Sequence, residues 1–239
     1  MRALFFKHFI FNHSDSSFNS IDIFLYLNYM TKVITIAQQK GGSGKTTLAA
    51  NLAVSLSSKH KLKTTILDAD PQGSLGKWFI QRENKLKDKN LIEMKTSSLW
   101  GVQYESNSLK DKTDIIIIDT PPKIDADGRP AIQIADLILI PVSPSQVDFW
   151  ATESIIDLAQ REKKKILVVI NRANAKSRLI KEAELFISKM KVQKSAIIIG
   201  NRQIFISTMG MGLSAIEKQR NGKGSIEINS LTSEVLSLI

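Results

Sequence analysis

Apolar residues follow two alternating patterns from residue 32 to the end of the chain. Short, nearly continuous apolar runs predict buried strands, and longer stretches with apolar residues every three or four positions predict amphipathic helices. The run of four isoleucines at residues 115–118 is typical of a central parallel strand that is covered on both faces. The predicted strands are residues 32–37, 64–67, 91–94, 115–118, 137–141, 166–171 and 196–199, and the predicted helices are residues 44–58, 75–84, 146–161, 178–190 and 225–238.

This alternation of strand and helix favours one fold class. Parallel β-α-β units place helices on both faces of a sheet, so we expect an α/β fold with a doubly wound, mostly parallel sheet. The sequence contains no internal repeat, low-complexity tract or obvious linker. Residues 30–239 are therefore predicted to form a single domain, and their number suits one α/β core.

Residues 1–29 differ from the rest of the chain, because they contain half of all its aromatic residues. A secretory signal fits poorly, since charged, apolar and small-residue regions do not follow one another in that order. Met30 stands directly before the first predicted strand. We interpret residues 1–29 as an atypical N-terminal extension and favour Met30 as the native start over a membrane-binding or partner-binding tail.

Composition and charge narrow the possible functions. The sequence has no cysteine, which excludes disulfides, thiolate metal sites and cysteine nucleophiles. No stretch reaches the roughly 18 consecutive apolar residues of a membrane span. The net charge is +10, which either reflects a solvated lysine-rich surface or attracts an anionic polymer such as nucleic acid.

The most specific chemical signal is the segment KGGSGKTT at residues 40–47, between a predicted strand and a predicted helix. We call this segment the phosphate loop. Its glycines allow backbone N–H groups to turn inward around a phosphate, and the helix that follows adds the positive end of its dipole. The pattern predicts that Lys45 contacts the β- and γ-phosphates of a nucleotide and that Thr46 binds Mg²⁺. The predicted nucleotide-binding residues of the loop are Lys40, Gly41, Gly42, Ser43, Gly44, Lys45, Thr46 and Thr47.

The loop departs from the common pattern G-x-x-x-x-G-K-[ST] at one position. The first glycine of that pattern is replaced by Gln39, and a second lysine, Lys40, follows it.

Two further segments end in acidic residues. IIIIDTPP ends a predicted central strand with Asp119, a position suited to holding Mg²⁺ through water at the mouth of the sheet. ILDADPQG ends another strand with Asp68 and Asp70. One of these two carboxylates could orient an attacking water molecule, but spacing alone leaves a simple turn role open.

These segments together resemble the ParA/MinD superfamily of deviant Walker A ATPases, and most of all the small ParA-type partition proteins of the ParF kind. The resemblance runs from about residue 32 to the end of the chain. The stretches that carry it are VITIAQQKGGSGKTTLAANLA, ILDADPQGSLGKWF, IIIIDTPP, DLILIPVSPSQVDFWA, NRQIFIS and GKGSIEINSLTSEVLSLI.

The resemblance implies roles for individual residues and for the cofactors ATP and Mg²⁺. Lys40 matches the family lysine that reaches across a nucleotide-sandwich dimer to the phosphates bound by the other subunit. Asp70 matches the aspartate associated with water activation. Asn171 matches an asparagine that often contacts adenine, although a strand-end cap is an equally good interpretation.

The resemblance also implies a function. Relatives form ATP-bound homodimers that bind double-stranded DNA without sequence preference, until a centromere-binding ParB- or ParG-like partner stimulates hydrolysis. That cycle moves plasmid or chromosome copies apart, so we expect a weak ATPase that is cytoplasmic and associated with the nucleoid. Arg202 matches a family position near the DNA-facing surface, and Lys218, Arg220 and Lys223 are candidates to join it. A solvated charge remains the alternative for each.

Four other functions fit the sequence less well. A MinD-like protein that cycles on membranes needs a basic amphipathic C-terminal helix, whereas residues 225–239 contain two glutamates and no basic residue. An iron-protein reductase needs cysteine ligands. A small-molecule enzyme such as a biotin-pathway synthetase needs a substrate pocket of which the sequence gives no sign. An inactive relative would not be expected to retain Lys40, Lys45, Thr46, Asp70 and Asp119.

Overall fold

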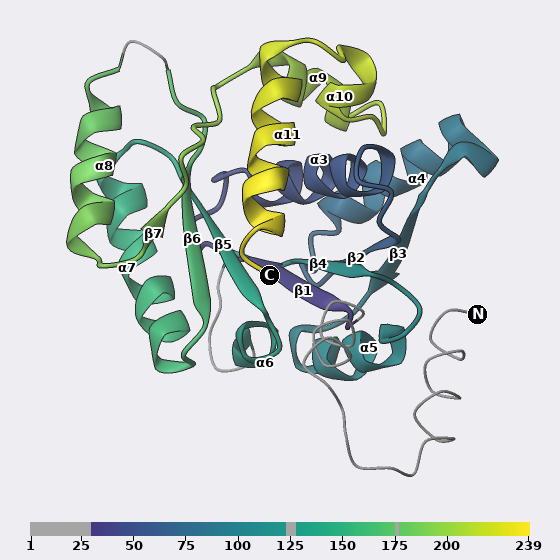
Figure 1. The fold of residues 1–239 in the computed structure, drawn as a ribbon, viewed down its shortest axis with the longest axis horizontal. Coiled ribbons are helices and arrows are strands. Elements are labelled where there is room, and N and C mark those ends of the chain that lie inside the picture. The colour runs from purple at the N-terminus through teal and green to yellow at the C-terminus, as the bar shows by residue number, and fades with distance from the viewer. Residues whose placement is uncertain (1–29, 123–127, 175–176) are drawn as a thin grey trace, which may run out of the picture.

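The computed structural model describes residues 30–122, 128–174 and 177–239. The predicted extension at residues 1–29 lies outside these ranges. The described strands form one seven-stranded parallel sheet in the order β3-β2-β4-β1-β5-β6-β7 (Figure 1). The strands are β1 (Lys32–Ile36), β2 (Thr64–Asp68), β3 (Ile92–Thr96), β4 (Ile115–Asp119), β5 (Leu137–Val142), β6 (Lys165–Ile170) and β7 (Gln193–Lys194).

Helices cover both faces of this sheet. In Figure 1, α3, α4 and the group α9 to α11 lie above it, whereas α5 and α6 lie below it and α7 and α8 stand at the left. The helices are α3 (Lys45–Ser58), α4 (Ser74–Leu86), α5 (Val102–Leu109), α6 (Arg129–Gln133), α7 (Gln146–Arg161), α8 (Leu179–Lys189), α9 (Gln203–Met209), α10 (Ala215–Lys218) and α11 (Lys223–Leu236), and the 3-10 turns are η1 (Lys87–Lys89) and η2 (Leu99–Gly101). The predicted fold class is confirmed.

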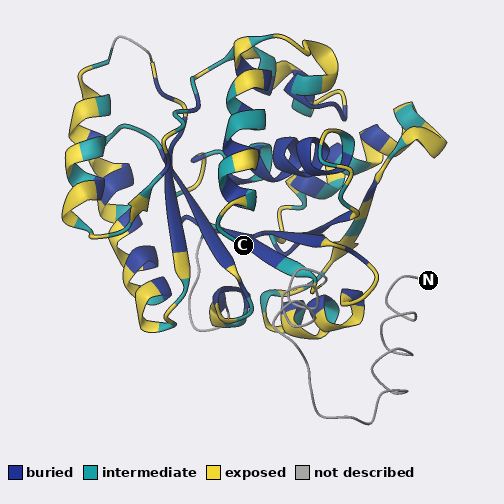
Figure 2. Ribbon diagram, viewed as in Figure 1, coloured by how far each residue is buried: buried dark blue, intermediate teal, exposed yellow. Residues whose placement is uncertain are grey.

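Strand β5 shows how the sequence divides the core. Leu137 and Leu139 point to the face covered by α3 and α11, whereas Ile138 and Ile140 point to the face covered by α7 and α8. All four side chains are fully buried, as expected for a parallel sheet with helices on both sides. Figure 2 shows the central strands β1, β2, β4, β5 and β6, together with α3, as the most deeply buried parts of the molecule.

One predicted strand is wrong. Residues 196–199 were expected to form the last strand, but β7 is the shorter segment Gln193–Lys194. The start of the apolar run is bound to α11, because Glu234 accepts hydrogen bonds from Ser195 Oγ and from the backbone N–H of Ala196, and the run returns to β6 only at Ile199, whose N–H donates to Ile170 at 2.9 Å. The short helices α5, α6, α9 and α10 were not predicted, since few turns leave little periodic signal.

None of the helices in the described ranges is long and apolar enough to cross a membrane.

Candidate nucleotide-binding site

The phosphate loop lies at the carboxyl edge of the sheet, between β1 and α3. Gly42 and Gly44 have φ angles of 81° and 92°, in the left-handed region where a side chain causes strain. Gly44 also has no room for one, because an added Cβ would lie 2.4 Å from Asn171 Nδ2. The loop therefore requires glycine at this position for two separate reasons.

A cavity of about 790 Å³ opens beside the loop. Its size suits a nucleotide, since small-molecule sites measure roughly 300–1,000 Å³. The residues that line it are Gly41, Gly42, Gly44, Lys45, Thr46 and Thr47 from the loop and α3, Asp70, Gln72, Ser74, Lys77, Trp78 and Gln81 from the aspartate turn and α4, and Pro122, Arg172, Met209 and Gly210 from elsewhere.

Lys45 places a positive charge inside this cavity. Its side-chain nitrogen donates to the carbonyl oxygen of Gln38 at 3.1 Å, and the residue is only 6% exposed. Burial lowers the pKa of Lys45, whereas the nearby carboxylates of Asp119 and Asp70 oppose that shift. An ammonium in a site of low dielectric attracts phosphate oxygens far more strongly than one in bulk water.

Thr46 lines the cavity, and its Oγ1 donates to Oδ2 of the buried Asp119 at 2.7 Å. Burial raises the pKa of Asp119 to about 7, although the hydrogen bond from Thr46 opposes that rise. Asp119 Oδ1 is buried and has no hydrogen-bond partner among the described residues, which is costly for a carboxylate oxygen. This unsatisfied acceptor fits a divalent cation or its bound water.

The described residues contain no cluster of three or more acidic or histidine side chains that could hold a metal alone. Magnesium does not need one, because it commonly binds through one or two carboxylates together with substrate phosphates and water. The pair Thr46 and Asp119 therefore fits Mg²⁺ bound together with a nucleotide.

The two carboxylates of ILDADPQG lie in different surroundings. Asp68 is 4% exposed, and its two oxygens accept the backbone N–H groups of Asp70 at 3.1 Å and Gly76 at 2.9 Å. Asp70 is half-buried and lines the cavity, with its Oδ1 accepting the N–H of Gln72 at 3.0 Å. Of the two, only Asp70 faces the space where a nucleotide would bind.

Lys40 forms an ion pair within its own chain. Its ammonium lies 2.9 Å from Asp148 Oδ2, and Asp148 is buried at the start of α7, where Ser145 is the N-cap. Lys40 remains 37% exposed. Asp148 was not predicted as a partner of Lys40, although it lies within the stretch DLILIPVSPSQVDFWA, because 108 residues separate the two.

Asn171 anchors the phosphate loop to the sheet. Its Nδ2 donates to the carbonyl oxygen of Ser43 at 2.7 Å, and its own backbone N–H donates to Val142 at 2.8 Å. This geometry favours the strand-end interpretation of Asn171. The next residue, Arg172, was not predicted. It adopts a φ of 54° and lines the cavity, and a Cβ added at Gly42 would lie 3.8 Å from its Nη1.

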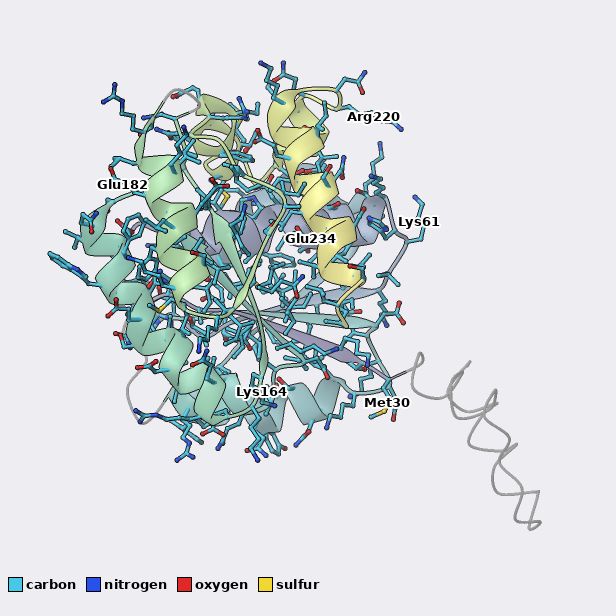
Figure 3. All side chains as sticks on the ribbon, turned by 60° about the vertical axis from the view of Figure 1, so that its left-hand side comes forward. Met30, Lys61, Lys164, Glu182, Arg220 and Glu234 are labelled. Carbon is cyan, nitrogen blue, oxygen red and sulfur yellow. The ribbon has the colours of Figure 1, made fainter. Side chains whose placement is uncertain are left out.

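The four predicted DNA-binding residues lie around the start of α11. Arg202 and Lys223 line a second hollow of about 370 Å³. Lys218 and Arg220 are exposed on the segment before α11, and Figure 3 shows Arg220 extending outward from the molecule. Arg202 differs from the others, because its Nε donates to Glu227 Oε2 at 2.8 Å and its charge is therefore compensated.

A parallel sheet, a glycine loop that opens a helix and a buried lysine define a nucleotide-binding protein. Residues 34–204 match the profile of the CobQ/CobB/MinD/ParA nucleotide binding domain. This match covers more than half of the chain, so the chain belongs to that family, and the resemblance to the ParA/MinD superfamily is confirmed.

Relatives with known names include cargo-positioning and cell-division proteins. The chain is 27% identical over 210 residues to maintenance of carboxysome distribution protein A of Halothiobacillus neapolitanus, covering 85% of this chain and 95% of the relative. It is 31% identical over 163 residues to chromosome partitioning protein ParA of Myxococcus xanthus, covering 53% of this chain and 56% of that protein. The septum site-determining protein MinD of Pyrococcus horikoshii, solved with Mg-ADP, shares the fold at a TM-score of 0.72 and 21% identity over 86% of this chain and 96% of its own.

Proposed function

We propose that this protein is an ATPase that dimerises on ATP, binds double-stranded DNA without sequence preference and hydrolyses ATP to segregate plasmids or chromosomes. The observation that supports the ATPase activity is that Lys45, Thr46 and Asp70 line one cavity, with Asp119 hydrogen-bonded to Thr46. A centromere-binding ParB- or ParG-like partner would stimulate hydrolysis. The protein would then be cytoplasmic and associated with the nucleoid.

Each residue has a task that follows from its surroundings. Lys45 balances phosphate charge, and the N–H groups of the phosphate loop orient the phosphates. Thr46 and Asp119 hold Mg²⁺, which when bound neutralises charge on the β- and γ-phosphates. Asp70 orients the attacking water from the opposite wall. Lys40 leaves Asp148 and reaches the nucleotide of the other subunit in the dimer.

Hydrolysis and nucleotide binding test the first part of this proposal. We expect slow ATP turnover in the wild type and loss of both turnover and binding of a fluorescent ATP analogue in Lys45→Ala. Lys61→Ala is the matched control, because Lys61 is exposed at the far end of α3 (Figure 3). Turnover that survives in Lys45→Ala would contradict the assignment of the phosphate site.

Lys40→Ala tests dimerisation separately. Light scattering with ATP should detect a dimer in the wild type and a monomer in Lys40→Ala, while the variant retains nucleotide binding. A Lys40→Ala protein that still dimerises with ATP would remove the proposed role across the interface.

Positioning of another cargo is a second candidate function. The match to this chain covers 95% of the carboxysome distribution relative but only 56% of the ParA relative. Both candidates need the same ATPase cycle on DNA and differ only in the cargo and the stimulating partner. Purification of the protein with its native partners would distinguish a centromere-binding protein from a microcompartment protein.

The arrangement of α11 favours DNA over a membrane as the surface on which the protein cycles. Ile228, Leu231 and Val235 of α11 are buried in the core beside α3, so its apolar face is already occupied. Membrane binding by an amphipathic helix needs that face free. If the protein pelleted with lipid vesicles in the presence of ATP, the result would support the MinD-like alternative and contradict this choice.

A further inference from the structure

Asp68 is a buried carboxylate beside the nucleotide cavity to which the proposed reaction gives no task. It ends β2, two residues before Asp70, and both of its oxygens are taken up by backbone N–H groups. We infer that Asp68 is a positioning residue that fixes the turn carrying Asp70 against the sheet and so directs Asp70 into the nucleotide cavity. This inference rests on the proposed ATPase function.

The hydrogen bonds of Asp68 span the whole turn. One oxygen accepts the N–H of Asp70 at the start of the turn, and the other accepts the N–H of Gly76 in the first turn of α4. The turn is closed between these points by the N–H of Gly73, which donates to the carbonyl oxygen of Asp70 at 2.9 Å. The backbone of Asp70 is therefore restrained from both sides.

Helix α4 depends on this carboxylate for its start. Its N-cap residue is Gly73, which has no side chain to accept the free N–H groups of the first turn, and that turn contains no acidic residue. Asp68 supplies both the acceptor and the negative charge from the neighbouring strand. One face of α4 then forms a wall of the cavity through Ser74, Lys77 and Trp78.

The same connection sets the position of Asp70 relative to the metal site. Asp68 is paired in register with Asp119 across β2 and β4, and the N–H of Ala69 donates to the Asp119 carbonyl oxygen at 2.9 Å. Burial raises the pKa of Asp68, while the N–H groups of Gly76 and Asp70 oppose that rise. A buried carboxylate is expensive, and an asparagine could not replace it, since its amide group has only one acceptor oxygen for two donors.

Asp68→Asn tests the inference at nearly constant size. Displacement of Asp70 should lower kcat about 10- to 100-fold, because small misplacements of a reacting group have effects of this order. The KM for ATP and the affinity for a fluorescent ATP analogue should stay within about twofold, since Lys45 and the phosphate loop are untouched. Equal losses in kcat and in nucleotide affinity would show a general structural defect and overturn the inference.

A double-mutant cycle asks whether Asp68 acts through Asp70. In an Asp70→Asn background, Asp68→Asn should lower kcat no further, because residues that act as a unit are not additive. A further loss equal to that of the single variant would contradict a positioning role. If Asp70→Asn alone leaves turnover unchanged, the proposed function fails in its assignment of Asp70, which is a separate result.

A control variant and a second test variant complete the experiment. Asp136→Asn is the matched control, because Asp136 also accepts a backbone N–H, that of Val33 at 2.8 Å, and should leave kcat unchanged. If Asp68→Asn does not fold, Gly76→Pro removes the donor from the other side, at the third residue of α4, where the backbone N–H has no partner within the helix. Gly76→Pro should lower kcat with unchanged ATP affinity, and normal kcat in that variant would overturn the inference.

Discussion

The nucleotide cavity and the basic surface at the start of α11 are built in opposite ways. Lys45, Asp119 and Asn171 are buried, and each has a fixed partner from another element. Lys218 and Lys223 are exposed side chains on a surface where charge matters more than exact placement. Substitutions in the cavity should therefore abolish function in single steps, whereas substitutions on the basic surface should reduce binding gradually and additively.

The largest effect is expected at Gly44. Gly44→Ala should lower nucleotide affinity at least 100-fold, because the residue combines a φ of 92° with a Cβ position 2.4 Å from Asn171 Nδ2. Gly41→Ala in the same loop is the comparison, with a smaller expected loss, since no described residue lies within 4 Å of its Cβ position. Titration with a fluorescent ATP analogue measures both. Similar losses in the two variants would mean that the loop is sensitive throughout and not at one packed position.

The next largest effect concerns the contact that joins the two regions. Helix α4 forms a wall of the cavity, and its residue Arg82 donates two hydrogen bonds to the carboxylate of Glu217 in α10, at 2.8 and 3.0 Å. The Arg82 guanidinium also lies over the ring of Trp78. Arg82→Met should lower the free energy of unfolding by about 3 kcal/mol, because it leaves a partly buried carboxylate without its partner. Urea unfolding measures the loss, and a loss below about 1 kcal/mol would indicate that the two regions are only loosely joined.

The pH dependence of the same contact follows from Glu217. Burial raises the pKa of Glu217, but Arg82 and Ser214 lower it more, so its folded pKa lies below the ordinary value of 4.5. The stability it contributes is therefore complete above pH 4.5 and is lost as the pH falls through the lowered pKa. The stability difference between wild type and Glu217→Gln should shrink below that pH, and a difference that grows on acidification would refute this account.

A smaller effect is expected at the edge of the cavity. Arg172→Ala should weaken nucleotide binding about tenfold, because a guanidinium beside the loop can form a charged hydrogen bond with the ligand. Arg178→Ala is the control, since Arg178 is exposed at the start of α8. Calorimetric titration with ADP and with ATP compares the two variants. An unchanged affinity in Arg172→Ala would place Arg172 outside the binding site despite its position on the cavity wall.

The same contrast explains which features the sequence could predict. The loop and Asp119 are local patterns in which neighbouring residues specify both the element and the proposed chemistry. In the structure the loop lines the cavity, and Asp119 accepts a hydrogen bond from Thr46 of that loop. The partnership of Lys40 with Asp148 was not visible, because the fold alone brings together residues that are far apart in sequence.

Burial and long-range hydrogen bonds account for the remaining differences. The spacing of Asp68 and Asp70 could not show which of them faces the cavity, because the two residues differ in how deeply the fold buries them. The apolar run at residues 196–199 has the pattern of a strand, but the backbone N–H of its first residue, Ala196, donates to Glu234 of α11. No local pattern predicts this long-range contact.

The smallest single effects are expected on the basic surface, and they also decide how the DNA would be held. Lys218→Ala, Arg220→Ala and Lys223→Ala should each weaken ATP-dependent DNA binding a few-fold and reduce the slope of log K against log salt by about 0.9, because each removes one phosphate contact. Arg202→Ala should change that slope less, since Glu227 already compensates its charge. Lys164→Ala, on the α7–β6 connection at the opposite end of the molecule from Arg220, is the control (Figure 3). If one of these substitutions abolished binding at all salt concentrations, the surface would be a specific site like the cavity, and the distinction between the two regions would fail.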